Sequence, residues 1–269
     1  DIDFESLNDA SIKNIVLIGK FCYDMNVRME YAGINKNKII LVDDISKLSE
    51  ILKNKTTGKI FSMVCFDKEI ELKKIIMINI LHLYYDLLNL YGENANTRCL
   101  HNELKRNGIK INIDFRSINE QINFDKYDIV YIGSGSEDNL FLALSDIMKR
   151  KNDIKKYIEN NGYLILTGNS MDLFGKYIIN NDEKMDALDI FDYHTKLINE
   201  KIFSNASGYR IVGEVVGTSE YIKEKIIGFQ NRCDLVYDIK SPLFKVNKEY
   251  SNDYESDGDG YHYKNVYAT

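Results

Sequence analysis

Short apolar runs alternate with segments of helical spacing along most of this chain. Residues 12–19 read IKNIVLIG, an apolar run that a glycine ends, and this is the form of a buried parallel strand. Residues 21–32 carry apolar side chains at helical spacing, Gly33 is placed to cap that helix, and residues 39–42 form a second apolar run. Strands that alternate with helices in this way predict a parallel sheet with helices on both faces.

The first 75 residues are predicted to form one small unit of this kind. After the second strand, an Asp-Asp pair is suited to cap a helix at 45–52, and residues 59–66 form a third apolar run. Residues 1–75 therefore read as a small Rossmann-like β-α-β unit. A short helix expected at 68–74 leads directly into the next strand, without a linker rich in Pro, Gly or Ser, so the predicted boundary is tight.

Residues 76–269 are predicted to form a second, larger α/β unit. Its expected strands are residues 76–83, 109–115, 127–132 and 163–166. Its expected helices are a short one within 85–91 and longer ones at 97–107, 139–160 and 171–178. Shorter β-like stretches at 211–216, 226–230 and 243–246 predict antiparallel strands at the sheet edge, and the polar residues 252–260 predict a loop.

The balance of charges argues against a nucleic-acid partner. The net charge is −6, and the sequence shows neither a basic excess nor a basic stripe. No apolar run reaches the roughly 18 residues that a membrane helix needs, and the opening DIDFE is not a signal peptide, so no transmembrane segment is expected. The four cysteines form no C-x-x-C pair, which predicts reduced thiols in a cytoplasmic protein and neither a zinc site nor disulfides.

Two strands of the second unit end in glycine-rich turns, at the edge where open α/β sheets bind their ligands. The turns read GSGS at 133–136 and TGNS at 167–170. Glycine lets backbone N–H groups approach a ligand, and the start of the following helix favours negative charge, as in an oxyanion hole or an anion site. The spacing fits equally well an ordinary strand-to-helix turn that needs positive φ.

The second turn belongs to a longer motif. Residues 164–175, LILTGNSMDLFG, resemble the nucleophile elbow of class I glutamine amidotransferases of the CobB/CobQ type, the group that includes GatD. In that group an apolar strand is followed by Cys-Gly-Gly-Tyr-Gln-Leu-Leu-Gly. Aligning the closing Leu-Leu-Gly with Leu173, Phe174 and Gly175 places the cysteine of the family at Gly168.

Further motifs occur in the order that this family shows. Residues 82–92, HLYYDLLNLYG, are similar to the family's opening LYPDLLNLYGD, with Tyr85 in place of proline and Glu93 in place of aspartate. The others are DIVYIGSG at 128–135 (a strand that ends in three glycines in the family), GFQN at 228–231 (GFEN) and YKNVYAT at 263–269 (the run before the catalytic histidine). The resemblance spans residues 76–269 and implies a flavodoxin-like class I glutamine amidotransferase domain with a mostly parallel sheet.

The first unit carries a second resemblance. Residues 16–33, VLIGKFCYDMNVRMEYAG, resemble the C-terminal domain of MurT, a Mur-ligase-like protein whose pattern there runs Gly-Glu-Arg, two residues, Asp-Met-Ala, one residue, Arg-Leu-Lys-Tyr-Ala-Gly. MurT and GatD are separate subunits that together amidate the glutamate of lipid II, so the resemblance implies a relation to that cell-wall system. The sequence has no G-x-x-x-x-G-K-[ST] motif, so ATP is expected only through a Mur-ligase-like ATP-binding domain or subunit.

The resemblance also implies which residues form the site. Glutamine hydrolysis in this class uses a cysteine thiolate, a histidine that activates it and an acid that orients the histidine. Gly168 stands at the nucleophile position, and the histidine position follows Thr269. The acid is placed on Asp24, because an aspartate of MurT is understood to complete the triad, although Asp24 equally fits a helix N-terminal carboxylate. The predicted substrate-binding residues are Gly133, Ser134, Gly135, Asn169 and Ser170.

Two functions from different classes follow from these residues. The predicted function is a glutamine amidotransferase-like protein, related to the MurT–GatD system, that lacks glutaminase activity because Gly168 has no nucleophilic side chain. The alternative is an active ammonia-supplying component of a cell-wall or cobyrinate-type amide ligase, with the hydroxyl of Thr167 or Ser170 as a weaker nucleophile. None of the four histidines occupies a catalytic position, and His82 is expected in the core. Glutamine is the substrate that the family implies, and neither a cofactor nor a metal is expected in this chain.

Overall fold

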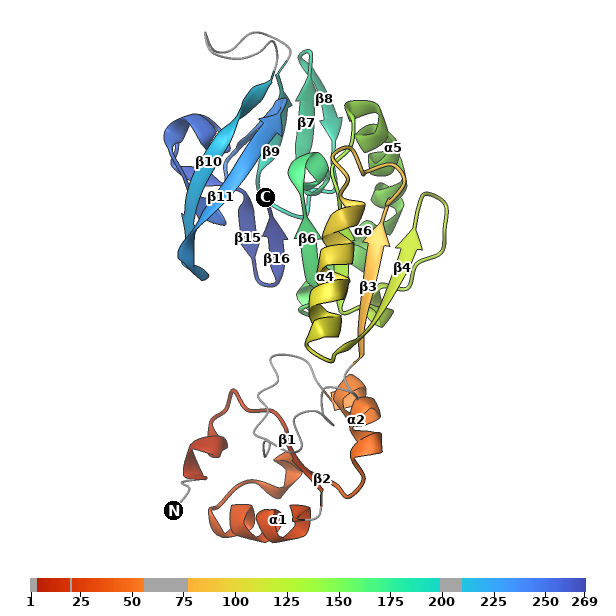
Figure 1. Ribbon diagram of the computed structural model, residues 1–269, viewed down its shortest axis with the longest axis vertical. Helices are drawn as coiled ribbons and strands as arrows, with labels where there is room; N and C mark the ends of the chain where they lie inside the picture. The colour runs from red at the N-terminus through yellow and green to blue at the C-terminus, as the bar shows by residue number, and fades with distance from the viewer. Residues whose placement is uncertain (1–3, 20, 56–76, 199–209) are drawn as a thin grey trace. The chain divides into compact units, whose positions relative to one another are not determined.

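The computed structural model describes residues 4–19, 21–55, 77–198 and 210–269. The chain divides into two compact units, which Figure 1 shows. The first is Asp1–Met77 together with Leu104–Lys110, and the second is Ile78–Glu103 together with Ile111–Thr269. The strand expected at 59–66 and the helix expected at 68–74 lie outside the described residues.

The described part of the first unit is a β-α-β arrangement followed by a helix. Its elements are β1 (Ile15–Ile18), α1 (Cys22–Tyr31), β2 (Ile39–Val42) and α2 (Leu48–Lys55), and β1 pairs in parallel with β2. The helix α1 ends at the expected cap, where Gly33 has a φ of 77°. The buried side chains of Leu17, Cys22, Met29 and Ile34 form the core of this unit.

A six-stranded sheet with the order β15-β16-β6-β5-β3-β4 lies at the centre of the second unit. Its strands are β3 (Met77–Leu83), β4 (Lys110–Arg116), β5 (Ile129–Ile132), β6 (Tyr163–Leu166), β15 (Tyr261–Tyr263) and β16 (Val266–Ala268). β16, β6, β5 and β3 pair in parallel, and β15 pairs antiparallel with β16 at the edge. Because parallel neighbours end at the same edge of a sheet, the turns that follow β5 and β6 lie side by side.

Helices cover both faces of this sheet, as the alternating pattern predicts. They are α4 (Asn94–Arg106), which crosses the near face in Figure 1, and α5 (Glu137–Ile147) and α6 (Lys151–Glu159), which lie behind it. The strand residues Leu83, Ile132 and Leu166 belong to one buried cluster with Leu140 and Ile147 of α5. No helix in the described ranges is long and apolar enough to cross a membrane.

The chain after β6 departs from the helix expected at 171–178. It forms a 3₁₀ helix, η6 (Gly168–Phe174), and then the strand β7 (Tyr177–Asn180). Gly175 separates them, and a Cβ at this position would lie 2.8 Å from Cδ2 of Tyr193, so the backbone passes close to that ring. Apolar spacing alone does not distinguish such a buried turn and strand from a buried helix.

β7 belongs to a second sheet that the sequence pattern did not predict. This sheet has the order β12-β9-β7-β8 and also contains β8 (Glu183–Asp186), β9 (His194–Leu197) and β12 (Asp234–Tyr237). Each of its strands is only four residues long. The pattern of apolar residues does not identify such short strands reliably.

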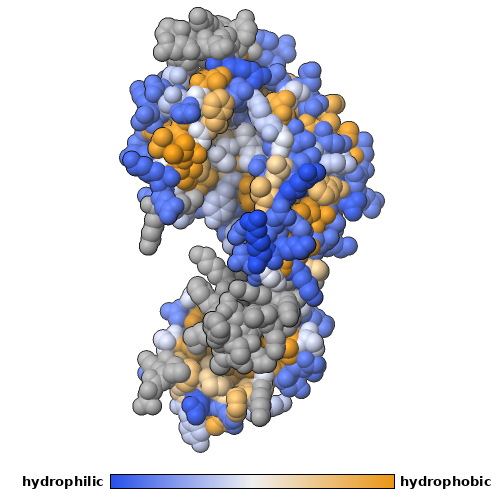
Figure 2. All heavy atoms as spheres, in the orientation of Figure 1, coloured by the Kyte–Doolittle hydropathy of each residue, from blue (hydrophilic) through white to orange (hydrophobic). Residues whose placement is uncertain are grey.

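The strands predicted after residue 211 form a third, antiparallel sheet, apart from the central one. Its strands are β10 (Ile211–Ser219), β11 (Ile222–Arg232), β13 (Phe244–Lys245) and β14 (Gly258–Asp259), so the expected loop at 252–260 contains a short strand. Alternate side chains of the β10–β11 hairpin remain exposed, with Ile227 at 77% and Phe229 at 66%. Figure 2 shows the corresponding hydrophobic patch over these two strands.

Candidate functional site

The turn after β6 has the backbone shape of a nucleophile elbow. Gly168 lies two residues after Leu166, the last residue of β6, has a φ of 58° and begins η6. A sharp strand-to-helix turn with a residue in the left-handed region is the geometry that presents a nucleophile above an α/β sheet. The Gly168 N–H donates a 2.6 Å hydrogen bond to the Thr269 carbonyl, and the Thr269 N–H donates to Leu166 O at 3.1 Å. Thr269, after which the resemblance places the histidine, therefore lies against the predicted nucleophile position.

The space in which a side chain at Gly168 would lie is filled by Ser134. A Cβ built on Gly168 would lie 2.7 Å from Ser134 Cβ and 3.3 Å from Ser134 Oγ. Ser134 follows β5 at the position where the family motif carries the second of three glycines, and it is buried. A cysteine at position 168 therefore requires the Ser134 side chain to move or to be absent.

Glu93 holds Ser134 in this position. The Ser134 hydroxyl and the Ser134 N–H both donate hydrogen bonds to Oε1 of Glu93, and the Tyr91 N–H donates to Oε2 at 2.9 Å. The Glu93 side chain is buried and comes from the segment between β3 and α4, where a series of turns replaces the short helix expected within 85–91. A Cβ at Gly133 would lie 2.8 Å from Glu93 Cβ, so glycine leaves room for this carboxylate.

The Asn169 side chain bonds to the backbone of Gly135. Its Oδ1 accepts a hydrogen bond from the Gly135 N–H at 3.0 Å, and its Nδ2 donates to the Gly135 carbonyl at 2.8 Å. The side chain thus ties the turn after β6 to the turn after β5. The N–H groups of Ser134 and Gly135, which an oxyanion hole at this place would use, are both taken by side chains of the chain itself.

The two hydroxyl groups beside Gly168 are held by other partners. Ser170 is fully buried, and its Oγ lies 3.1 Å from the Ile132 carbonyl and 2.9 Å from the Thr167 carbonyl. The Thr167 hydroxyl lies 2.9 Å from the Tyr131 hydroxyl, which also accepts a 2.8 Å bond from Asn96 Nδ2. Within the described residues neither hydroxyl contacts a histidine, so neither has the base that would activate it.

Six of the seven predicted site residues belong to the second unit, and they come together there. Gly133, Ser134, Gly135, Gly168, Asn169 and Ser170 meet at the carboxyl ends of β5 and β6. Asp24 belongs to the first unit, where it lies exposed in the first turn of α1, and that position fits a carboxylate at a helix N-terminus.

His82 lies in the core of the second unit, on β3. Its ring is fully buried, Nδ1 lies 3.4 Å from Thr97 Oγ1, and Nε2 has no hydrogen-bond partner in the described part of the chain. Burial lowers the pKa of His82 to about 4, so the ring is neutral at physiological pH. This confirms the expectation that His82 is a core residue.

Asp172 is a buried carboxyl near the elbow that the sequence analysis does not single out. Its Oδ1 accepts a 2.8 Å hydrogen bond from the Thr195 hydroxyl, and among the described residues its Oδ2 has no hydrogen-bond partner. Burial raises the pKa of Asp172 well above its usual value, and the neighbouring Asp234 raises it further. The alignment at Gly168 places Asp172 opposite the glutamine of the family motif. This difference from the family could have pointed to Asp172 from the sequence.

Comparison with known proteins assigns both parts of the chain. Residues 79–269 match the family model of the CobB/CobQ-like glutamine amidotransferase domain, and residues 1–66 match that of the MurT ligase C-terminal domain. The chain is similar to the lipid II isoglutaminyl synthase (glutamine-hydrolyzing) subunit GatD of Streptococcus pneumoniae (strain ATCC BAA-255 / R6), with 27% identity over 71% of this chain and 72% of that protein. It is also similar to the subunit of the same name in Staphylococcus aureus (strain N315), with 31% identity over 71% of this chain and 75% of that protein. The chain therefore belongs to the CobB/CobQ-like glutamine amidotransferase family.

Proposed function

We propose that this chain is a glutamine amidotransferase-like component of a lipid II amidation system and that it does not itself hydrolyse glutamine. The similarity to two GatD subunits supports the relation to that system. The observation that carries the loss of activity is the Ser134 side chain, which fills the space that a cysteine side chain at position 168 would need.

The polar groups around this position support the same conclusion. Hydrolysis of the glutamine amide passes through a tetrahedral intermediate whose oxyanion needs free N–H donors. Here the donors of Ser134 and Gly135 are bonded to Glu93 and Asn169. Because the Glu93 carboxylate is an acceptor, it would also repel an oxyanion that approached the same N–H groups. The N–H groups of the turn after β5 are thus satisfied by side chains of the protein itself, without a substrate.

A domain with this fold and without the nucleophile would act as a scaffold or a regulatory subunit. The match of residues 1–66 to the MurT ligase C-terminal family supports a Mur-ligase-like ATP-binding domain or subunit as its partner, through which ATP would act. The described cysteines, Cys22, Cys99 and Cys233, are free thiols, which supports the cytoplasmic location that we propose.

The alternative function is an active glutaminase that uses a hydroxyl nucleophile, and Thr167 is the residue that favours it. Thr167 directly precedes Gly168 and is partly exposed, and its hydroxyl lies 2.9 Å from the Tyr131 hydroxyl. Tyr131 is a poor base for this purpose, because burial raises its pKa above the usual value for tyrosine and keeps the phenol protonated.

Glutamate release from glutamine separates the two functions. The unmodified protein should release no glutamate above the background of Thr167→Val and Ser170→Ala, with Ser145→Ala as a control for an exposed hydroxyl. A glutamine chloroketone should give no adduct on Thr167 or Ser170 when the labelled peptides are mapped by mass spectrometry. Steady glutamate release that Thr167→Val abolishes and Ser145→Ala preserves would establish the alternative.

A further inference from the structure

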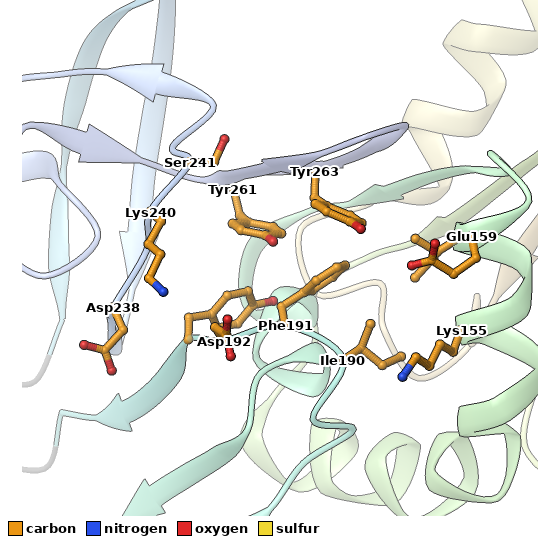
Figure 3. A pocket seen from close by; sticks show the side chains of 12 residues that line it. Lys155, Glu159, Ile190, Phe191, Asp192, Asp238, Lys240, Ser241, Tyr261 and Tyr263 are labelled. Atoms are coloured by element: carbon orange, nitrogen blue, oxygen red, sulfur yellow. The ribbon is translucent and has the colours of Figure 1, made fainter. Parts of the chain in front are cut away.

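A cavity of about 400 Å³ opens in the second unit. It lies between α6, the segment 190–193, the segment 238–241 and the edge strand β15, as Figure 3 shows. None of the elbow residues lines it. A volume of this size falls in the range of pockets for small organic ligands, roughly 300–1,000 Å³.

Aromatic rings form the middle of this cavity. Phe191 and Tyr193 are buried, and the ring of Phe191 lies 4.8 Å from that of Tyr261 and 5.8 Å from that of Tyr263, between ring centroids. The Tyr193 hydroxyl donates to the Met171 carbonyl at 2.7 Å, which fixes the lower layer. The upper rings, Tyr261 and Tyr263, are partly exposed, so part of their aromatic surface is open to contact with a planar group.

Two of the acidic side chains that line the cavity are paired with lysines, and the third is bonded to a histidine. Glu159 lies 2.5 Å from Lys264 Nζ, Asp192 lies 3.2 Å from Lys176 Nζ, and Asp238 lies 2.9 Å from His194 Nδ1. Burial raises the pKa of Tyr261 to about 12, so this ring adds no negative charge. Two of the three acids, Glu159 and Asp192, therefore contribute little net repulsion toward an anionic ligand.

Two lysines in the lining have no such partner. Within the described residues, neither Lys155 nor Lys240 makes a hydrogen bond or an ion pair, and both are exposed. Lys155 exerts only a longer-range attraction on Glu159, whose pKa is lowered first by the hydrogen bond from Lys264. The two lysines lie on opposite sides of the aromatic rings in Figure 3.

The two ends of the cavity differ in the charged side chains around them. At the α6 end, Lys155 and Lys264 face one carboxylate, Glu159, so a positive charge is in excess. At the other end, Lys240 stands with Asp192, Asp238 and the Ser241 hydroxyl, which offer both donors and acceptors. A lysine ammonium is a compact point charge that commonly binds a phosphate.

We propose that this cavity binds a nucleoside monophosphate. The phosphate lies at Lys155, the planar base stacks on Tyr263 and Tyr261, and the polar edge of the base or the ribose hydroxyls bond to Asp238, Lys240 and Ser241. The site lies outside the elbow, so it does not depend on whether the chain hydrolyses glutamine.

Calorimetric titration of the protein with UMP and AMP tests this proposal. At least one of them should bind saturably, and Lys155→Ala should raise its dissociation constant about tenfold, the effect of one lost charge-assisted contact. Lys240→Ala should weaken binding less. Lys149→Ala removes an exposed lysine that does not line the cavity and should leave the dissociation constant unchanged.

Uridine and inorganic phosphate complete the test. Each should bind more weakly than the nucleotide, because each lacks one half of the proposed contacts. The proposal is wrong if neither nucleotide binds at millimolar concentration, if inorganic phosphate binds as tightly as the nucleotide, or if Lys155→Ala leaves binding unchanged. Since Lys155 and Lys240 are exposed, their variants should fold, and circular dichroism of each variant verifies this.

Discussion

At the scale of the residue, Gly168 lacks the catalytic side chain of the family, and the Ser134 side chain fills the space beside it. The family motif carries cysteine at the first position and glycine at the second, and this chain carries glycine and serine. Gly168 keeps the positive φ of the elbow, while the Ser134 side chain extends into the space beside it and bonds to Glu93. The backbone shape of the elbow is therefore separable from its chemistry.

Because Ser134 fills this space, we predict that Gly168→Cys alone lowers the free energy of unfolding. Gly168→Cys places a side chain in the left-handed region, at about 1–2 kcal/mol, and overlaps Ser134 in addition. Adding Ser134→Gly should recover about 1 kcal/mol of the free energy of unfolding, because the overlap disappears. Urea denaturation of the two single variants and the double variant measures this coupling.

A control pair shows whether the recovery is specific. Ser145 lies in α5 and does not contact position 168. The effect of Ser145→Gly on the free energy of unfolding should therefore add to that of Gly168→Cys. If the effects of Gly168→Cys and Ser134→Gly also add without coupling, Ser134 does not fill the space of the missing side chain.

The sequence could predict the position of this site but only part of its structure. The alignment of a short motif identified Gly168, and the two glycine-rich turns pointed to Gly133, Ser134 and Gly135. The clamp that Asn169 makes with Gly135 joins residues 34 positions apart, and Glu93 reaches Ser134 across 41 positions. Such contacts depend on the pairing of β5 with β6 and on the course of a loop, which local patterns do not determine.

At the scale of the element, strands with clear ends were predicted well, and short segments between turns were not. The run that forms β6 ends at Leu166, and the parallel pairing of β6 with β5 follows from the alternating pattern. The helix expected at 171–178 fails because the backbone passes closely over Tyr193 at Gly175. That contact belongs to the tertiary structure, so the spacing of apolar residues gives no sign of it.

The start of α5 offers a test of how the site is anchored. Ser136 is the N-cap of this helix, and its Oγ accepts a hydrogen bond from the Asn139 N–H at 3.4 Å. Ser136→Ala should lower the free energy of unfolding by about 1 kcal/mol, as the loss of an N-cap does. Ser145→Ala, within the same helix, should cost less, since alanine has the higher helix propensity. Thermal unfolding that ranks the two variants in the opposite order would contradict this role of Ser136.

At the scale of the whole molecule, three buried carboxyls around one arginine link stability to pH. Burial raises the pKa of Asp172, of Asp234 and of Asp259, and Arg232 opposes the rise in each case. Within the residues that the structure describes, the Arg232 Nε and the Asp172 Oδ2 have no hydrogen-bond partner, so the polar groups of this cluster are incompletely bonded. The folded protein therefore holds protons on this cluster more tightly than the unfolded chain does.

The sign of the pH dependence follows directly. An aspartate in the unfolded chain releases its proton near pH 3.9, whereas these folded carboxyls release theirs at higher pH. Between those two values the folded state binds more protons than the unfolded state, so the free energy of unfolding falls as the pH rises. The contribution of the cluster is fully present below about pH 4 and is lost as the pH rises through the folded pKa values.

Asp172→Asn isolates the largest part of this effect. The amide oxygen can still accept the hydrogen bond from the Thr195 hydroxyl, while the group no longer titrates. We expect the variant to be more stable than the unmodified protein at pH 8, by about 1.4 kcal/mol for each pKa unit relieved, and to lose less stability between pH 5 and pH 8. Asp186→Asn, at an exposed position on β8, should leave the slope unchanged. Urea denaturation across this pH range decides the matter, because equal slopes in Asp172→Asn and in the unmodified protein would mean that Asp172 is ionised in the folded state throughout.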